Sequence, residues 1–133
     1  MEDVRALCHR IREIGFSIHV YLGHGYVEKV YENALAHRLS KAGILIQRQS
    51  PIRVKDEDGT IIGELVPDML IERVLLVEIK AVHSLVAEHQ AQMLGYLKAT
   101  GMEHGLLINF GAYRFQAKKY VRTRHVHEAA TNG

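Results

Sequence analysis

Three charged residues interrupt an apolar, β-prone stretch that runs from Pro67 to Lys80. Its two halves meet at a polar pair, which is typical of a β-hairpin. Because side chains alternate along a strand, Glu78 and Lys80 share one face. A loop over residues 72–74 would also place Asp68 opposite Glu78 on that face. The sequence therefore predicts two carboxylates and one ammonium group at the end of a hydrophobic hairpin.

This group of charges indicates metal-assisted chemistry. Two close carboxylates in a partly buried site repel each other, and one is normally protonated. A divalent cation removes that conflict, and oxygen ligands suit Mg²⁺ or Mn²⁺. Lys80 could then stabilise charge on a phosphate or orient a water molecule, while an ordinary lysine pKa of about 10.4 argues against a role as base. A solvated strand edge with a Glu/Lys pair remains the alternative.

The same residues, in this order, resemble the signature of the PD-(D/E)xK nuclease superfamily: Pro67-Asp68, then Glu78-Ile79-Lys80. Residues 25–31 (Gly-Tyr-Val-Glu-Lys-Val-Tyr) match the GxxExxY motif of a small bacterial family within it. Residues 92–96 (Gln-Met-Leu-Gly-Tyr) match the QxxxY motif of its RecB-like branch. The resemblance extends over residues 20–109.

The resemblance implies an α/β protein with the restriction-endonuclease-like αβββαβ core, a central mixed sheet flanked by helices. It also implies a metal-dependent nuclease that hydrolyses DNA phosphodiester bonds. Asp68, Glu78 and the Ile79 carbonyl would hold Mg²⁺ or Mn²⁺, and Glu28 would complete the acidic shell. Lys80 would position the water or stabilise the transition state.

Further residues receive roles from the same resemblance. Gln92 and Tyr96, one helical turn apart, would border the site and contact the nucleic-acid backbone or the lysine. Tyr31, a neighbour of Glu28 on one helix face, would contact nucleic acid, and a core tyrosine is the alternative. Independently of the resemblance, Glu64 lies four residues before Asp68 and could supply a third oxygen ligand. A histidine at position 89 is common in the family, although a lone histidine is more often structural.

Apolar periodicity predicts helices over residues 2–22, 26–41 and 84–100. Ser84 is a plausible N-cap for the last of these. The residues expected to face the core are Val27, Val30, Ala34, Leu35 and Leu39 in the second helix and Ala91, Leu94 and Leu97 in the third. Outside the hairpin, strands are expected over residues 44–49, 52–55, 60–66, 104–110 and 113–122.

The last predicted strand carries a run of basic residues with aromatic residues between them. Arg114, Lys118 and Lys119 could neutralise phosphates while aromatic rings stack on unpaired bases. An exposed edge strand protected by lysines would have the same pattern.

The bulk composition limits the remaining possibilities. The 133 residues are 47% apolar and 24% charged, as in a globular protein with one domain. We expect a helical part at 1–43, a sheet and active-site core at 44–122 and a frayed tail at 123–133. A single cysteine, Cys8, excludes an internal disulfide and fits a cytoplasmic protein, and no signal peptide or membrane span is visible.

Other function classes find less support. The nine histidines and one cysteine lack the spacing of a zinc site, and no glycine-rich loop of a nucleotide hydrolase is present. A net charge of +2 does not by itself identify a nucleic-acid partner. DNA is the expected partner, and the chain could act as a homodimer or as a subunit of a larger complex. A catalytically weak nucleic-acid-binding or protein-interaction module that retains the nuclease fold remains the alternative.

Overall fold

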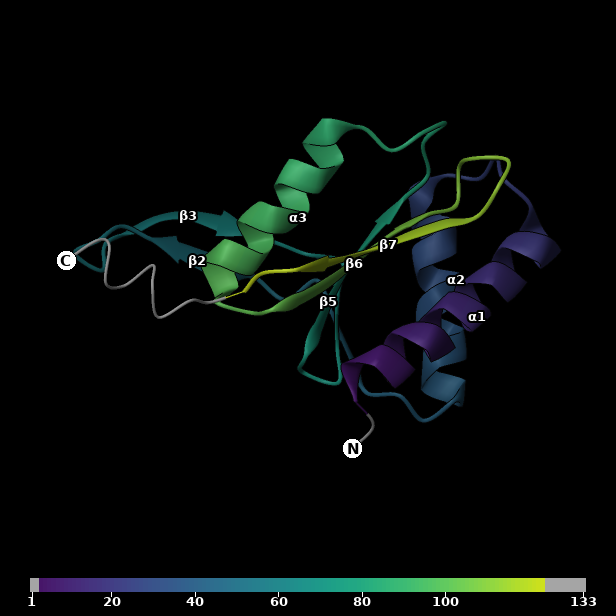
Figure 1. Ribbon diagram of the computed structural model, residues 1–133, viewed down its shortest axis with the longest axis horizontal. Helices are drawn as coiled ribbons and strands as arrows, with labels where there is room; N and C mark the ends of the chain where they lie inside the picture. The colour runs from purple at the N-terminus through teal and green to yellow at the C-terminus, as the bar shows by residue number, and fades with distance from the viewer. Residues whose placement is uncertain (1–2, 124–133) are drawn as a thin grey trace.

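The computed structural model describes residues 3–123, so the predicted tail lies almost entirely outside the described residues. Three helices and seven strands follow one another along this part of the chain (Figure 1): α1 (Val4–Leu22), α2 (Glu28–Lys41), β1 (Ile46–Arg48), β2 (Ile52–Lys55), β3 (Ile61–Leu65), β4 (Met69–Ile71), β5 (Leu75–Lys80), α3 (Ala87–Thr100), β6 (His104–Asn109) and β7 (Gln116–Val121).

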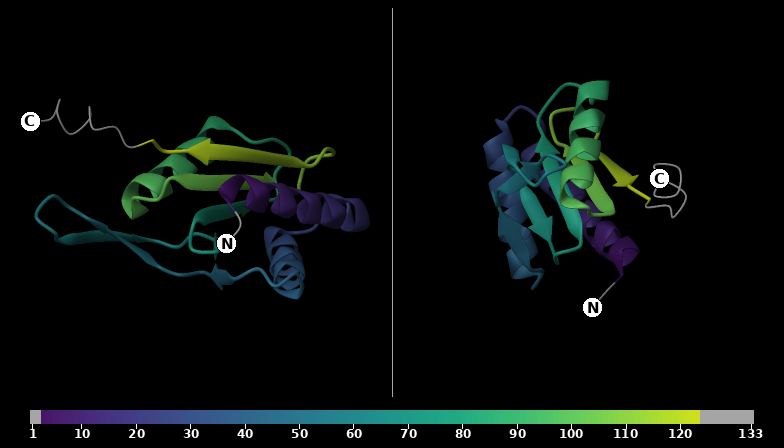
Figure 2. Two further views of the ribbon diagram at one scale, coloured as in Figure 1. Left: turned by 60° about the horizontal axis from the view of Figure 1, so that its bottom comes forward. Right: turned by 90° about the vertical axis from the view of Figure 1, so that its left-hand side faces the viewer.

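The central sheet has five strands in the order β1-β4-β5-β6-β7. Its β5–β6 pair is parallel, and the other three pairs are antiparallel. The parallel pair needs a crossover connection, which α3 supplies. The helices α1 and α2 cover one face of the sheet, and α3 covers the other (Figures 1 and 2). The predicted mixed sheet flanked by helices is therefore confirmed.

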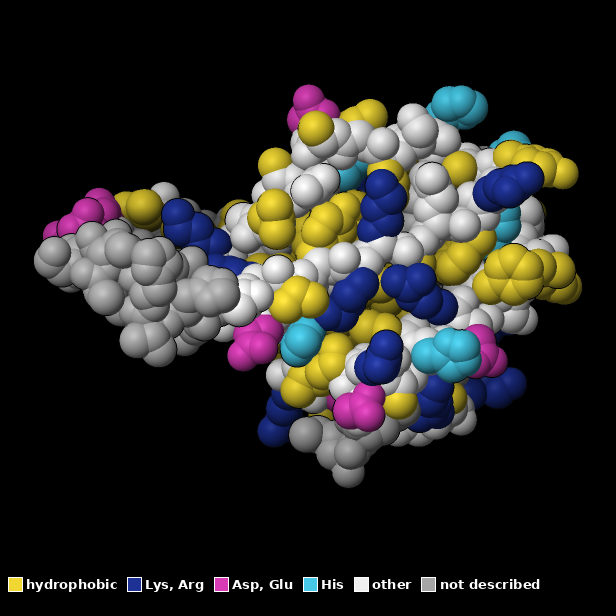
Figure 3. Space-filling model, viewed as in Figure 1, with side chains coloured by type: hydrophobic (Ala, Val, Ile, Leu, Met, Phe, Trp, Pro, Cys, Tyr) yellow, Lys and Arg dark blue, Asp and Glu magenta, His cyan; other side chains and the backbone are white. Residues whose placement is uncertain are grey.

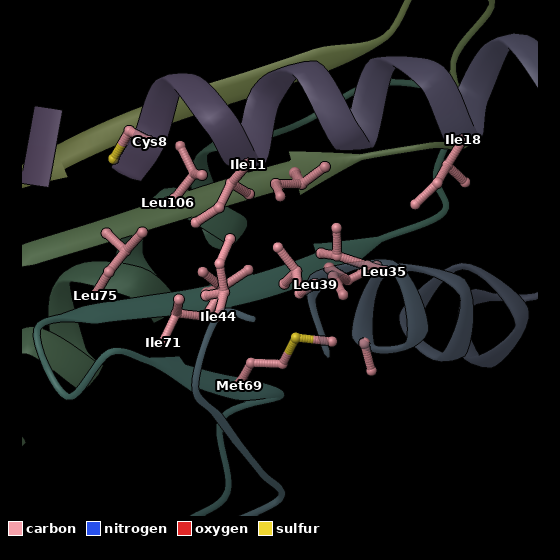
Figure 4. Close-up of a cluster of buried hydrophobic side chains, with 14 of the residues drawn as sticks. Cys8, Ile11, Ile18, Leu35, Leu39, Ile44, Met69, Ile71, Leu75 and Leu106 are labelled. Carbon is pink, nitrogen blue, oxygen red and sulfur yellow. The ribbon is translucent and has the colours of Figure 1, made fainter. Parts of the chain in front are cut away.

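Alternation along β5 divides the core between these two faces. Val77 and Ile79 pack in a large cluster with the apolar sides of α1 and α2. Figure 4 shows part of this cluster, with Ile11 of α1, Leu39 of α2 and Leu75 of β5 among the labelled side chains. Leu76 points the other way, into a smaller cluster with Met93 and Leu97 of α3. Because Glu78 and Lys80 have the parity of Leu76, they lie on the α3 face, at the end where β5 stops.

The β4–β5 hairpin has the predicted three-residue loop, because its register is centred on Arg73. Both Glu72 and Arg73 have positive φ, at 51° and 59°, which is unusual for residues other than glycine. Two contacts with Leu45 hold this loop: the Leu45 N–H donates to the Glu72 carboxylate at 2.7 Å, and the Glu72 N–H donates to the Leu45 carbonyl at 2.9 Å.

The predicted strands at 52–55 and 60–66 form β2 and β3, but they do not join the central sheet. They pair only with each other, in a two-stranded antiparallel ribbon that projects away from the sheet (Figures 1 and 2). We call this element the β2–β3 ribbon. Its tip is a tight turn in which Gly59 has a φ of 88°.

Two helix predictions need correction. The second helix starts at Glu28, so Val27 is its N-cap and is 71% exposed. Leu35 and Leu39 face the core as predicted, together with Tyr31, whereas Val30 is exposed. The third helix starts at Ala87, beyond Ser84; it buries Leu97 as predicted, together with Met93 and Tyr96, whereas Ala91 and Leu94 are exposed. Val27 precedes the first residue of α2, and Val30, Ala91 and Leu94 occupy helix positions outside the buried stripes.

Candidate active site

The hairpin brings Asp68 and Glu78 together at the edge of the sheet. The last pair of the β4–β5 register is Met69 with Val77, so Asp68 stands one step further, opposite Glu78. The Asp68 N–H donates to Glu78 Oε1 at 2.7 Å, and the Ile79 N–H donates to Asp68 Oδ2 at 2.7 Å. Each carboxylate is thus held by a main-chain N–H of the opposite segment, which fixes the two acids relative to each other.

The Ile79 carbonyl is directed toward the same place. The carbonyl of the next residue, Lys80, accepts a hydrogen bond from the Phe110 N–H, on the β6 side of β5. Successive residues of a strand direct their N–H and C=O groups to opposite sides. The Ile79 carbonyl therefore faces the β4 side, where Asp68 lies, in agreement with the hydrogen bond from the Ile79 N–H.

Burial and mutual repulsion shift the ionisation of these acids. Glu78 is 4% exposed, and burial together with the neighbouring Asp68 raises its pKa to about 8. Burial also raises the pKa of Asp68. Lys80 Nζ lies 3.9 Å from Glu78 Oε2, too far for a close ion pair, so its opposing influence on the Glu78 pKa is smaller. In the absence of a cation, the site holds a proton on Glu78 at neutral pH.

Glu28 approaches this pair from the first turn of α2. Burial raises its pKa, and the next largest cause is the charge of Asp68. Within residues 3–123, however, no three Asp, Glu, His or Cys side chains are arranged to hold one ion. Asp68 and Glu78 are therefore the two acids in contact, and Glu28 stands beside them as a third carboxylate at a longer range.

A chain of side-chain hydrogen bonds connects the site lysine to α3. Lys80 Nζ donates to Gln92 Oε1 at 2.8 Å, and Gln92 Nε2 donates to the Tyr96 hydroxyl at 3.2 Å. Tyr96 is 7% exposed, and its ring packs against the α3 face of the sheet. The structure thus brings Lys80, Gln92 and Tyr96 together, and the buried tyrosine sets the orientation of the amide that holds the ammonium group.

Two minor candidates have other contacts. The imidazole of His89 accepts a hydrogen bond at Nδ1 from the Val86 N–H, so it caps the start of α3. Glu64 is exposed on β3, where Arg53 is its cross-strand partner. In the part of the chain that the structure describes, neither side chain has a hydrogen bond or ion pair with Asp68, Glu78 or Lys80.

A network behind Asp68 was not anticipated from the sequence. Glu32, on α2, is 3% exposed and accepts hydrogen bonds from Arg48 at 2.8 Å and from Gln49 at 3.1 Å. The Gln49 N–H donates to the Asp68 carbonyl at 3.1 Å, and its side chain hydrogen-bonds the Asp68 carboxylate. The available signal was the spacing of Glu32, which follows Glu28 by four residues and shares its helix face.

The tyrosine predicted to contact nucleic acid is a core residue. Tyr31 is 0% exposed, and its ring stacks on Phe110 with centroids 4.8 Å apart. Its hydroxyl donates to the Gly23 carbonyl at 2.6 Å and accepts from the Tyr26 N–H at 3.2 Å. A side chain enclosed in this way is inaccessible to nucleic acid, and its role is to fix the loop that precedes α2.

The three basic residues near the C-terminal strand point in different directions. Arg114 is exposed in the loop before β7, which starts three residues later than predicted. Lys119 pairs with Leu106 on the α1 face and lies 2.8 Å from His104 Nδ1, so it faces away from the active site. Lys118 is exposed and pairs with Leu107, on the α3 face. Of the two lysines on β7, Lys118 therefore shares a face of the sheet with Glu78, and Lys119 does not.

Comparisons with known proteins agree with this geometry. A family model described as the PD-(D/E)XK nuclease superfamily matches residues 5–123. None of the curated protein sequences matches the chain. Within residues 3–123, no helix has the length and apolar content that crossing a membrane requires.

Two solved structures share the fold at low sequence identity. The protein SSO0001 superposes with a TM-score of 0.59 and 19% identity, over 77% of this chain and 53% of its own. An alkaline exonuclease from Laribacter hongkongensis superposes with a TM-score of 0.53 and 15% identity, over 78% of this chain and 58% of its own. The chain thus spans a little over half the length of each of these proteins.

Proposed function

The chain belongs to the PD-(D/E)XK nuclease superfamily, and we propose that it is a metal-dependent nuclease that hydrolyses DNA phosphodiester bonds. The observation that carries the proposal is the contact of Asp68 with Glu78 beside a lysine whose ammonium group is held by Gln92. We further propose that it belongs to the GxxExxY family of the RecB-like branch. In support, Glu28 of the first motif and Gln92 and Tyr96 of the second lie around the same carboxylates.

The residues at the site fit a divalent cation. Asp68 and Glu78 are in contact, and the pKa of Glu78 is raised to about 8. A cation bound between the two carboxylates would relieve their mutual repulsion. The Ile79 carbonyl offers a third oxygen on the same side. All three are hard oxygen donors, which favours Mg²⁺ or Mn²⁺ over softer metals. Asp68, Glu78 and Ile79 would hold the ion, and Glu28 would complete the acidic shell.

A bound Mg²⁺ or Mn²⁺ supplies Lewis acidity toward a phosphoryl oxygen and lowers the pKa of a water molecule. The protein supplies orientation and charge. Lys80, held at Nζ by Gln92, can donate a hydrogen bond to the attacking water or to a non-bridging phosphate oxygen. Tyr96 and Gln92 act as positioning residues, because they fix where the ammonium group lies before the substrate arrives.

Cleavage assays with matched variants test this proposal. Circular single-stranded and supercoiled DNA would be incubated with Mg²⁺ or Mn²⁺ and with wild type, Asp68→Asn, Lys80→Ala or the control Glu64→Gln. We expect metal-dependent cutting by wild type and the control, and a loss of at least about a hundredfold in the two site variants, as for other groups that act on a transition state. Cutting of circles would make the activity endonucleolytic.

Two results would contradict the proposal. Equal cutting by wild type, Asp68→Asn and Lys80→Ala would identify a contaminant. If wild type is silent on every substrate with either metal, the chain is better described as a binding module that retains the nuclease fold. RNA substrates of the same length, assayed in parallel, determine whether the activity is restricted to DNA.

A further inference from the structure

The helix α3 lies beside the β2–β3 ribbon and contacts it through β2 (Figure 1). Residues of these two elements line an open groove beside the candidate active site. Its volume is about 840 Å³. One wall carries Arg53 and Lys55 of β2, and the other carries Gln92, Tyr96 and Lys98 of α3. None of these residues except Gln92 and Tyr96 has a part in the site described above.

The charged side chains in the lining are all cationic. Arg53, Lys55 and Lys98 are exposed, and the lining contains no Asp or Glu. The cross-strand partner of Arg53 is Glu64, but among the described residues no ion pair joins them. In Figure 3 the ribbon at the left carries both basic and acidic side chains. The groove therefore offers three positive charges that form no ion pair among the described residues, while the acidic residues Asp56, Glu57 and Asp58 of the ribbon turn lie outside its lining.

The groove is continuous with the active site. Gln92 lines its first end and also accepts the hydrogen bond from Lys80. Lys98, six positions further along α3, lies about 9 Å away at a rise of about 1.5 Å per residue. A linear polyanion in the groove would thus extend directly from the place where Lys80 and the two carboxylates meet.

The dimensions fit one strand of nucleic acid. A volume of about 840 Å³ over a length of about 10 Å gives a mean cross-section of roughly 80 Å², which a cylinder about 10 Å wide would fill. A duplex is wider than its own major groove of about 12 Å. Charges repeat about every 3.4 Å along one strand of a duplex and more widely along an extended single strand, so at most about three phosphates lie within reach of the three cations.

We propose that this groove binds a single-stranded segment of DNA adjacent to the scissile bond, through contacts of Arg53, Lys55 and Lys98 with its phosphates. This inference rests on the proposed nuclease function for the identity of the ligand. Tyr96, the aromatic residue in the lining, is buried and offers no free ring face for base stacking. The binding is therefore electrostatic and independent of base sequence, and it weakens steeply with salt.

Salt-dependent binding without metal tests the groove separately from catalysis. A fluorescent single-stranded oligonucleotide would be titrated in EDTA at several salt concentrations with wild type and with a triple variant, Arg53→Ala, Lys55→Ala, Lys98→Ala. The matched control also removes three exposed cations, Arg5→Ala, Arg12→Ala, Lys41→Ala, from helices outside the groove. Circular dichroism and thermal unfolding establish that each variant is folded.

The expected signature is a change of slope. Three phosphate contacts on a single strand contribute about −2 to the slope of log K against log salt, and the triple variant should lose that amount while the control retains it. A duplex of the same length should bind more weakly than the single strand. Unchanged slope in the triple variant, equal loss in the control, or tighter binding of the duplex would each overturn the proposal.

Cleavage assays run in parallel separate the two claims. If wild type cuts DNA and Asp68→Asn does not, but the triple variant binds and cuts like wild type, the groove proposal fails and the nuclease proposal stands. If wild type does not cut but the slope changes as expected, the groove proposal stands as a binding site and the nuclease proposal fails.

Discussion

Replacement of Glu78 by glutamine should flatten the pH dependence of the folding stability of the metal-free protein. Burial and the nearby Asp68 raise the Glu78 pKa from 4.5 to about 8. Such a carboxyl stabilises the folded state below its unfolded pKa, and this contribution is lost as the pH rises through the folded pKa. At about 1.36 kcal/mol per pH unit, the loss from Glu78 between pH 4.5 and pH 8 is on the order of 5 kcal/mol. Glutamine keeps an acceptor for the Asp68 N–H but has no such proton to lose.

Urea unfolding in EDTA at pH 5 and pH 8.5 measures this effect. At pH 5 the Glu78 side chain is neutral in the folded protein, so wild type and Glu78→Gln should have similar free energies of unfolding. At pH 8.5 the variant should be more stable by several kcal/mol. Glu64→Gln, a change on the exposed ribbon, should follow wild type at both pH values. A difference between wild type and Glu78→Gln that does not change with pH would refute the reasoning.

Three other changes test separate parts of the site. Tyr96→Phe removes the hydroxyl to which Gln92 donates; the loss of about 1 kcal/mol should lower the single-turnover cleavage rate about fivefold without a large change in Tm. Binding of Mn²⁺ at pH 7 should release about one proton from Glu78, which calorimetry in two buffers of different ionisation enthalpy detects, and Glu78→Gln should release none. Glu32→Ala leaves Arg48 without its buried partner and should cost about 2–3 kcal/mol in chemical denaturation; a cost below about 1 kcal/mol would contradict a structural role for the pair.

The local sequence pattern was sufficient to predict that the residues at the centre of the candidate site lie together. The alternation of β5 and the loop centred on Arg73 placed Asp68, Glu78 and Lys80 together, because all three depend on a single hairpin register. The mixed sheet with helices on both faces also followed from the order of the predicted elements and the resemblance. These features depend on periodicity and on short connections, both of which one sequence displays.

Features that depend on contacts between distant segments were not predictable in the same way. Tyr31 is a core residue because Phe110 stacks on it, and no local pattern reveals that partner. The face of Lys119 depends on the register of β7 with β6. The β2–β3 ribbon was predicted as two strands. Whether two such strands join the central sheet depends on which of its edge strands are available for pairing, and local sequence does not show this.

The hydrophobic clusters on the two faces of the sheet differ in size, and this difference affects which segments unfold locally most easily. The cluster beneath α1 and α2 includes Val77 and Ile79 of β5, whereas α3 rests on a small cluster that contains Met93 and Leu97. Segments with few buried apolar contacts open at a lower free energy than the core strands, and their amide hydrogens exchange sooner. Amides of α3 should therefore exchange before those of β5. The α3 side of the groove should therefore open locally while Asp68 and Glu78 keep their positions on the slowly exchanging hairpin.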